Sequence, residues 1–71
     1  MTDTKKLEAM LITKGKTKTD IARLINRSLQ TVYNKMNNIV DFKGKEIIAI
    51  SEYLKLTNKE RDAIFFAKQV D

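Results

Sequence analysis

The sequence predicts an all-α protein built from five short helices in one domain. The 71-residue chain has no proline and only two glycines, so few residues break its helical segments. Apolar side chains recur at the three- and four-residue spacing of helices that bury one face. Residues 17–20 and 57–60 both read Thr-X-X-acid, the pattern of a capping box at a helix start. The nearest strand candidate, residues 46–50, lies inside a helical period.

The first helix is expected over residues 3–14 and the second over residues 18–25. Gly15 can adopt the left-handed conformation that ends the first helix, and Thr17 with Asp20 caps the second. The side chains expected to be buried are Leu7, Met10 and Leu11 on the first helix, and Ile21, Ala22, Leu24 and Ile25 on the second.

A third helix is expected over residues 29–37, after a turn at Asn26 and Arg27. Asparagine tolerates the left-handed conformation, and Ser28 is a good N-cap. Val32 and Met36 are spaced to point inward, with Tyr33 at the edge of the buried face. The side chains expected to be more exposed are Leu29, Gln30, Thr31, Asn34 and Lys35.

The fourth helix, expected over residues 44–54, follows a loop in which Phe42 turns inward. Its apolar stripe comprises Ile47, Ile50, Ser51 and Leu54, with Ile48 and Tyr53 beside it. The fifth helix starts at the second capping box, is expected to reach about residue 69, and carries Ala63, Ile64, Phe66 and Ala67. Ile64, Phe65, Phe66 and Val70 make this last segment apolar over more than half its circumference. It is therefore either deeply packed or half of a subunit interface.

Composition argues against the common catalytic and metal chemistries. Without cysteine or histidine the chain lacks the usual zinc ligands, a thiol nucleophile and an imidazole base. The acids expected on exposed faces, as caps or surface charges, are Asp20, Glu46, Glu52, Glu60 and Asp62. We therefore expect no enzyme, no metal and no cofactor. With no apolar run long enough for a membrane span and no signal segment, we expect a cytoplasmic protein that does not bind membranes.

The net positive charge is concentrated in the first half of the chain. Residues 1–38 carry eight basic and three acidic side chains, whereas residues 39–71 carry six of each. Such an asymmetry favours a polyanion or an acidic protein surface as the partner of the first half. The alternative is a solvated basic face without a partner.

Residues 18–37 have the pattern of two helices joined by a short turn, a helix-turn-helix. Ala22 is small where the helix over residues 29–37 must cross closely. Ile21, Ile25 and Val32 can fill the space between the two helices. The exposed face of the helix over residues 29–37 is then free to enter a DNA major groove, which is about 12 Å wide.

The stretch from residue 17 to residue 37 resembles the helix-turn-helix of the phage repressor and Cro-type proteins. Together with Asp41-Phe42, Glu46-Ile47-Ile48 and residues 56–66, it makes residues 5–68 resemble small regulators of Gram-positive phages and prophages. The resemblance implies a five-helix lambda-repressor-like DNA-binding domain over residues 1–71. Such a domain is usually a homodimer, binds a double-stranded DNA operator and regulates the switch between lysis and lysogeny in the bacterial cell.

The same resemblance assigns candidate DNA contacts by position. Ser28 would cap the recognition helix, and the base-reading candidates are Leu29, Gln30 and Asn34. Side-chain amides such as these can pair with adenine N6 and N7. Leu29 stands where many members carry a polar base reader; it can touch a thymine methyl or pack against Ile25 or Tyr33. The DNA-backbone candidates are Lys14, Lys16, Lys18, Arg27, Thr31 and Lys35.

A second hypothesis concerns a protein partner. Small phage proteins of this same fold include modulators of repression, which bind a repressor protein and alter its DNA binding. Under this hypothesis the candidate protein interface comprises Leu29, Tyr33, Ile64, Phe65 and Phe66. The basic first half and the amides of the third helix favour DNA, whereas these apolar side chains favour a repressor.

Overall fold

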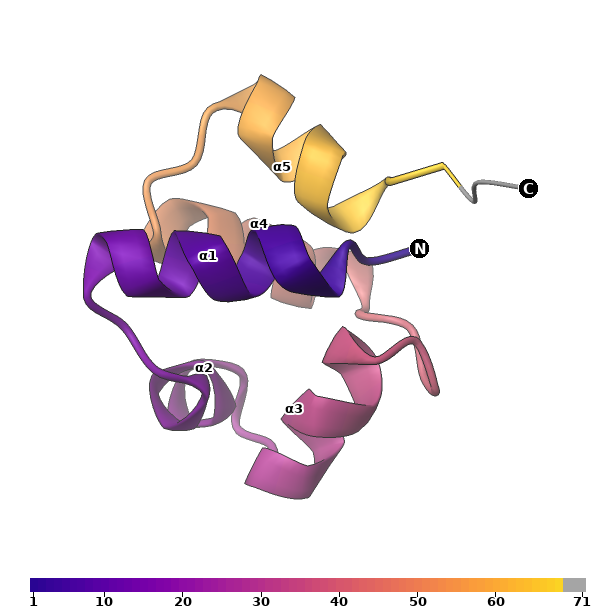
Figure 1. Ribbon diagram of the computed structural model, residues 1–71. Coiled ribbons are helices and arrows are strands. Elements are labelled where there is room, and N and C mark those ends of the chain that lie inside the picture. Colours follow the sequence, from indigo (N-terminus) through magenta and orange to yellow (C-terminus); the bar gives the residue numbers. More distant parts are fainter. Residues whose placement is uncertain (69–71) are drawn as a thin grey trace.

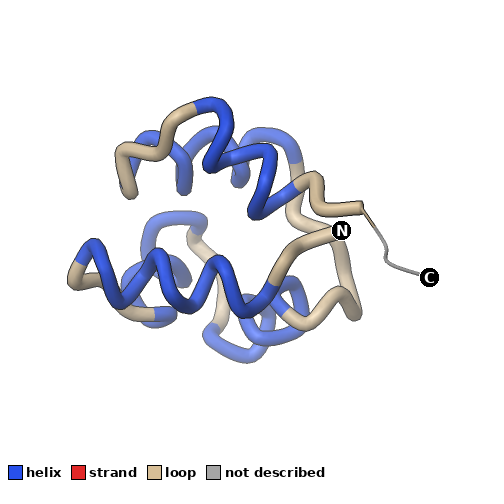
Figure 2. Tube along the Cα trace, turned by 45° about the horizontal axis from the view of Figure 1, so that its top comes forward, coloured by secondary structure: helices blue, strands red, loops and turns tan. Residues whose placement is uncertain are grey.

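A computed structural model describes residues 1–68 as five α-helices joined by short loops (Figures 1 and 2). The helices are α1 Thr4–Lys14, α2 Lys18–Ile25, α3 Leu29–Met36, α4 Gly44–Tyr53 and α5 Asn58–Phe65. No strand occurs among residues 1–68, so the predicted all-α class is confirmed. Within the same residues, no helix combines the length and apolar character needed to cross a bilayer.

The helices pack around one hydrophobic core. In Figure 1, α1 crosses the middle of the molecule in front of α4, with α5 on one side and the pair α2 and α3 on the other. Phe42, which precedes α4, turns inward as predicted and meets Phe65 of α5 edge to face, with 5.4 Å between ring centroids. The buried apolar side chains are Leu7, Leu11, Ile21, Ala22, Val32, Met36, Phe42, Ile47, Ile50, Leu54, Ile64 and Phe65.

Both predicted capping boxes are present. The Thr17 hydroxyl accepts a hydrogen bond from the Asp20 N–H at 3.1 Å, while the Asp20 carboxylate accepts one from the Thr17 N–H at 2.8 Å. Thr57 and Glu60 form the same reciprocal pair at 3.1 and 2.8 Å. The hydrogen bonds from the Thr17 and Thr57 N–H groups hold the pKa values of Asp20 and Glu60 below their usual range. Local sequence therefore fixes where α2 and α5 begin.

The turns on either side of α2 also form as predicted. Gly15, with a φ of 68°, ends α1 in the left-handed conformation. Asn26, with a φ of 56°, does the same after α2, and the Arg27 N–H returns to the Ala22 carbonyl at 3.0 Å. Ser28 then caps α3 by accepting a hydrogen bond from the Thr31 N–H at 3.1 Å.

The N-terminal residues are held between the α3–α4 loop and the end of α5. The Asn38 side chain accepts from the Thr2 N–H at 2.8 Å and donates to the Thr2 carbonyl at 2.9 Å. On the other side, the Asp3 N–H donates to the Ile64 carbonyl at 2.7 Å and the Ala67 N–H donates to the Met1 carbonyl at 3.0 Å. Both ends of the described chain therefore meet beside the loop that follows α3 (Figure 1).

These hydrogen bonds of residues 1–3, called the N-terminal clamp below, explain why the predicted extent of the fifth helix is wrong. The segment after Phe65 leaves the helix, and the Ala67 N–H pairs with Met1 instead of with a helical carbonyl. Phe66 is consequently 58% exposed, whereas Phe65 packs into the core. The predicted continuation to residue 69, and Val70 with it, lies partly outside the described residues.

Two other burial predictions are wrong. Leu24, expected in the core, is 36% exposed because α2 turns Ile21 and Ala22 inward instead. Ile48, expected beside the buried stripe of α4, is also exposed, since Ile47 and Ile50 face the core.

Candidate nucleic-acid interface

The candidate interface is formed by α2, the turn at residues 26–28 and α3. In Figure 1, α2 is viewed nearly along its axis while α3 runs across the view, so the two helices cross steeply. Ile21 and Ala22 from α2 and Val32 from α3 are buried where they meet, as the sequence predicts. This packing leaves the opposite side of α3 facing outward at one end of the molecule.

The outward face of α3 combines two apolar and two amide side chains. Leu29 is 39% and Tyr33 is 38% exposed, one helical turn apart on the same side. The Gln30 amide nitrogen donates to the Asn34 amide oxygen at 3.1 Å, which holds the two amides together. The four residues Leu29, Gln30, Tyr33 and Asn34 are called the α3 face below.

Lys18 lies beside this face but is already engaged. Its ammonium stands 4.9 Å from the centroid of the Tyr33 ring and 3.5 Å from a carboxylate oxygen of Glu8. The ion pair is partly exposed and therefore weak. Exchanging this ion pair for a contact with another anion would therefore cost little.

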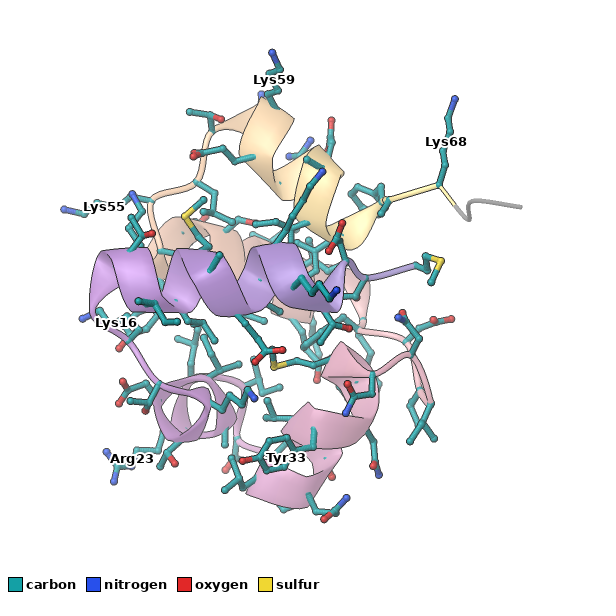
Figure 3. All side chains as sticks on the ribbon, viewed as in Figure 1. Lys16, Arg23, Tyr33, Lys55, Lys59 and Lys68 are labelled. Atoms are coloured by element: carbon teal, nitrogen blue, oxygen red, sulfur yellow. The ribbon has the colours of Figure 1, made fainter. Side chains whose placement is uncertain are left out.

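Four other predicted DNA-backbone residues each occupy a different environment. Lys14 is exposed in the last turn of α1, and Lys16 lies over the Tyr53 ring at 4.9 Å. Figure 3 shows Lys16 on the same side of the molecule as Arg23. Thr31 is half-buried, and its hydroxyl forms a 2.9 Å hydrogen bond with that of Ser28 at the helix start. Arg27, in the turn, reaches Glu46 of α4, with its Nε 3.8 Å from a carboxylate oxygen.

The prediction that Lys35 is exposed is wrong, and so is the surface position expected for Glu46. The two side chains are only 3% and 4% exposed and form a 2.6 Å ion pair between α3 and α4. Moving the Lys35 ammonium to a phosphate would leave the Glu46 carboxylate buried without its main partner, which is costly. Lys35 is therefore a structural residue and is removed from the proposed backbone contacts.

The buried Glu46 carboxylate accepts more than one hydrogen bond. Besides Lys35, its carboxylate accepts a 2.8 Å hydrogen bond from the Lys43 N–H at the start of α4. Burial alone would raise the pKa of Glu46, but the hydrogen bonds from Lys35 and Lys43 and the charges of Lys35 and Arg27 outweigh it, and the pKa is lowered. The carboxylate is therefore ionised in the folded protein at neutral pH.

The predicted protein interface on α5 is mostly interior. Ile64 and Phe65 are buried within their own chain and offer no surface to a partner, while Phe66 is exposed. The separation follows from the end of α5, because Phe66 is the first residue outside the helix. Leu29 and Tyr33 are thus the accessible members of the predicted interface, together with Phe66.

Sequence reasoning missed one basic residue at this end of the molecule. Arg23 is exposed on α2, on the side away from Ile21 and Ala22, and Figure 3 shows it extending at the same end as Tyr33. It forms no ion pair within residues 1–68. Its helical spacing from the buried residues of α2 could have identified it as an outward cation.

Comparison of the chain with protein-family models, with curated proteins and with solved structures finds no match. Among residues 1–68, acidic side chains also form no group of three or more that could hold a metal ion.

Proposed function

We propose that this chain is a helix-turn-helix regulator of the phage repressor and Cro type, with a lambda-repressor-like fold, that binds operator DNA through α3. It would act in the bacterial cytoplasm as a phage- or prophage-encoded protein, with no catalytic step. Binding at a promoter would exclude RNA polymerase. A homodimer is part of this proposal, since two copies of α3 would be needed to read two half-sites of an operator.

The observation that carries the proposal is the α3 face itself. A capped helix of eight residues lies at one end of the molecule, with Leu29, Gln30 and Tyr33 exposed. Gln30 and Asn34 place two side-chain amides on this face, and a single side-chain amide can pair with the N6 and N7 edge of adenine. Arg23, an exposed cation on α2 at the same end of the molecule as Tyr33, can contact a phosphate beside this face.

A gel-shift titration on the promoter region beside the protein's own gene tests this proposal. We expect specific binding at about 10⁻⁸ M that weakens steeply with salt, because phosphate contacts release counterions. The double variant Gln30→Ala/Asn34→Ala should lose specific binding while retaining weak, salt-sensitive binding. Lys59→Gln removes an exposed charge from α5 and serves as the control. No shift at low salt, with the protein folded, would contradict the proposal.

A second candidate function is favoured by the composition of the same face. Leu29 and Tyr33 are both more than a third exposed, an apolar pair that a protein partner could cover. Three of the predicted phosphate ligands are already paired within the chain, namely Lys18, Arg27 and Lys35. These features suit a modulator that docks on a phage repressor and alters the repressor's DNA binding.

The two candidates respond to different substitutions. Leu29→Ala/Tyr33→Ala should abolish a complex with the neighbouring repressor but leave phosphate-driven DNA binding measurable. Lys18→Ala/Asn34→Ala should weaken DNA binding and leave the repressor complex intact. Gel shifts with and without the repressor separate these outcomes. If the protein changes the repressor's shift but never shifts DNA alone, the modulator hypothesis replaces the first proposal.

A further inference from the structure

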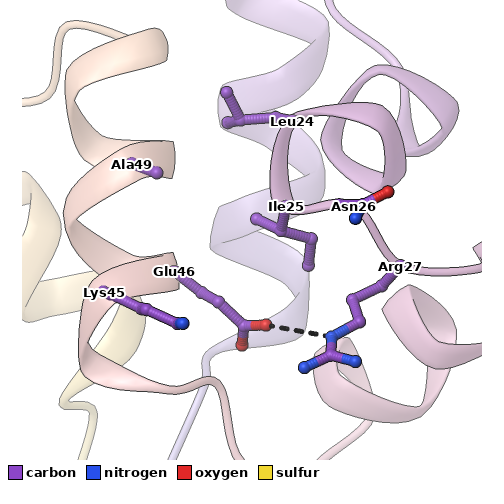
Figure 4. A pocket seen from close by; sticks show the side chains of 7 residues that line it. All are labelled: Leu24, Ile25, Asn26, Arg27, Lys45, Glu46 and Ala49. Atoms are coloured by element: carbon purple, nitrogen blue, oxygen red, sulfur yellow. Dashed lines mark ion pairs between the residues drawn. The ribbon is translucent and has the colours of Figure 1, made fainter.

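A second surface of the molecule lies between α2 and α4, away from the α3 face. It is an open pocket of about 390 Å³ (Figure 4). In Figure 4, side chains from the end of α2 and the following turn face those from the first half of α4 across it. Its lining residues are Leu24, Ile25, Asn26, Arg27, Lys45, Glu46 and Ala49.

The pocket has an excess of positive charge. Glu46 provides its one carboxylate, which already receives a 2.6 Å ion pair from Lys35 behind it. Arg27 approaches the other carboxylate oxygen only to 3.8 Å, and its terminal nitrogens form no hydrogen bond with residues 1–68. Lys45 is exposed and has no ion-pair partner in that part of the chain. Two cations at the rim of the pocket are thus available to an anion.

The rest of the lining is aliphatic except for Asn26, and comprises Leu24, Ile25 and Ala49. Leu24 is 36% exposed although it lies on a helix whose other aliphatic residues turn inward, and Ala49 faces it from α4 (Figure 4). A DNA backbone has little use for an aliphatic wall, because its outer surface is phosphate and sugar. An aliphatic side chain next to a carboxylate, as on an amphipathic acidic helix, matches both the cations and the wall.

The pocket is separate from the α3 face. Tyr33 and Lys35 are two residues apart, which places them about 200° apart around α3. Tyr33 is more than a third exposed, while the Lys35 ammonium pairs with Glu46 of α4, which lines the pocket. A partner in the pocket would therefore leave Leu29, Gln30 and Tyr33 uncovered.

We propose that this pocket is a docking site for an acidic, amphipathic segment of a partner protein, whose carboxylate pairs with Arg27 and Lys45 and whose aliphatic side chain packs on Leu24 and Ala49. The site goes beyond the proposed function, and the two share Arg27, which is also a predicted DNA-backbone contact. A regulator with two such surfaces could hold a protein partner while α3 is engaged elsewhere.

The test is an NMR titration of the ¹⁵N-labelled full chain with a synthetic helical peptide that carries Glu and Leu at i, i+4 spacing on one face. We expect shifts concentrated at the amides of Leu24, Arg27, Lys45 and Ala49. The double variant Arg27→Gln/Lys45→Gln should bind about tenfold more weakly, because two charge-assisted contacts are lost. Its helix content, measured by circular dichroism, should be unchanged, since both side chains are substantially exposed.

Matched controls decide whether the pocket is the cause. Lys55→Gln/Lys59→Gln removes the same charge from the far end of the molecule and should bind the peptide like the wild type (Figure 3). A peptide with Gln in place of Glu should bind weakly. Equal loss in both double variants, equal binding of the Gln peptide, or shifts elsewhere would overturn the proposal. Shifts at these amides with a DNA duplex but not with the acidic peptide would also overturn it, and would make the pocket a nucleic-acid contact.

Discussion

Both sides of α3 carry polar side chains, but one side is accessible to a partner and the other joins α3 to α4. On the outward side, Gln30 and Asn34 bond to each other and remain accessible to a partner. On the inward side, Lys35 carries a full charge, yet it is buried against Glu46 and joins α3 to α4. The two sides differ in what lies against them: Glu46 of α4 covers Lys35, whereas the α3 face stays partly exposed beside Lys18. A charged residue on a candidate recognition helix is therefore evidence for binding only when its surroundings are known.

The largest effect is expected from breaking the inward side. Lys35→Met should destabilise the protein by about 3–5 kcal/mol, because Glu46 is left ionised and buried without its partner. A core of this size supplies a similar amount, so the variant should be largely unfolded. Urea denaturation followed by circular dichroism measures the change. The double variant Lys35→Met/Glu46→Leu should recover most of the loss. A cost below about 1 kcal/mol for the single variant would show that the pair is unimportant.

Two apolar residues of α3, one buried and one exposed, should also differ in how much they contribute to stability. Met36→Ala, in the core, should cost about 2–5 kcal/mol, because it leaves a cavity. Leu29→Ala, on the α3 face, should change the free energy of unfolding by less than about 0.5 kcal/mol. The same denaturation experiment compares them. Similar costs for both substitutions would indicate that Leu29 is packed and not available to a partner.

Two asparagines in the left-handed conformation extend the comparison to the loops. Asn38 has a φ of 64°, and its side chain makes two hydrogen bonds to the Thr2 backbone. Asn38→Gly should cost about 1–3 kcal/mol through loss of those bonds. Asn26→Gly is the matched control, because the Asn26 side chain makes no hydrogen bond within residues 1–68. Its expected change is a few tenths of a kcal/mol in either direction. Equal losses would mean that the N-terminal clamp adds no stability.

The smallest effect concerns pH. Glu46 has a folded pKa below its ordinary value of 4.5, so the carboxylate contributes stability above about pH 4.5. That contribution is lost as the pH falls through the folded pKa. Asp20 and Glu60 act in the same direction. Thermal unfolding of the wild type should therefore shift to lower temperature under acid. The Lys35→Met/Glu46→Leu variant should shift less; an identical acid shift would show that Glu46 contributes nothing to it.

Much of the fold could be predicted because its signals are local. The bounds of α2 match the sequence prediction at both ends, since Thr17 and Asp20 fix its start and Asn26 fixes its end. The predicted bounds of α1, α3 and α4 differ from the structure by one residue at one end each. The end of α5 could not be predicted, because it depends on a hydrogen bond between Ala67 and Met1 at opposite ends of the chain.

The candidate site was predicted less completely, for the same reason. The exposure of Leu29 and Gln30 follows from helical spacing alone. The burial of Lys35 depends on Glu46, eleven residues away on another helix. No pattern among neighbouring residues of the sequence predicts such a pair. The pocket between α2 and α4 likewise requires that Leu24 and Lys45 be brought to the same surface by the packing of two helices.

The central claim is that the α3 face binds DNA, and the most direct measurement is NMR shift mapping of the full chain with a duplex from the promoter beside its own gene. The proposed function predicts that the amides of Leu29, Gln30 and Tyr33 shift strongly at low salt, while those of α5 do not. The shifts should shrink as salt is added. No shift along α3 at low salt, or equal shifts over all five helices, would contradict the claim.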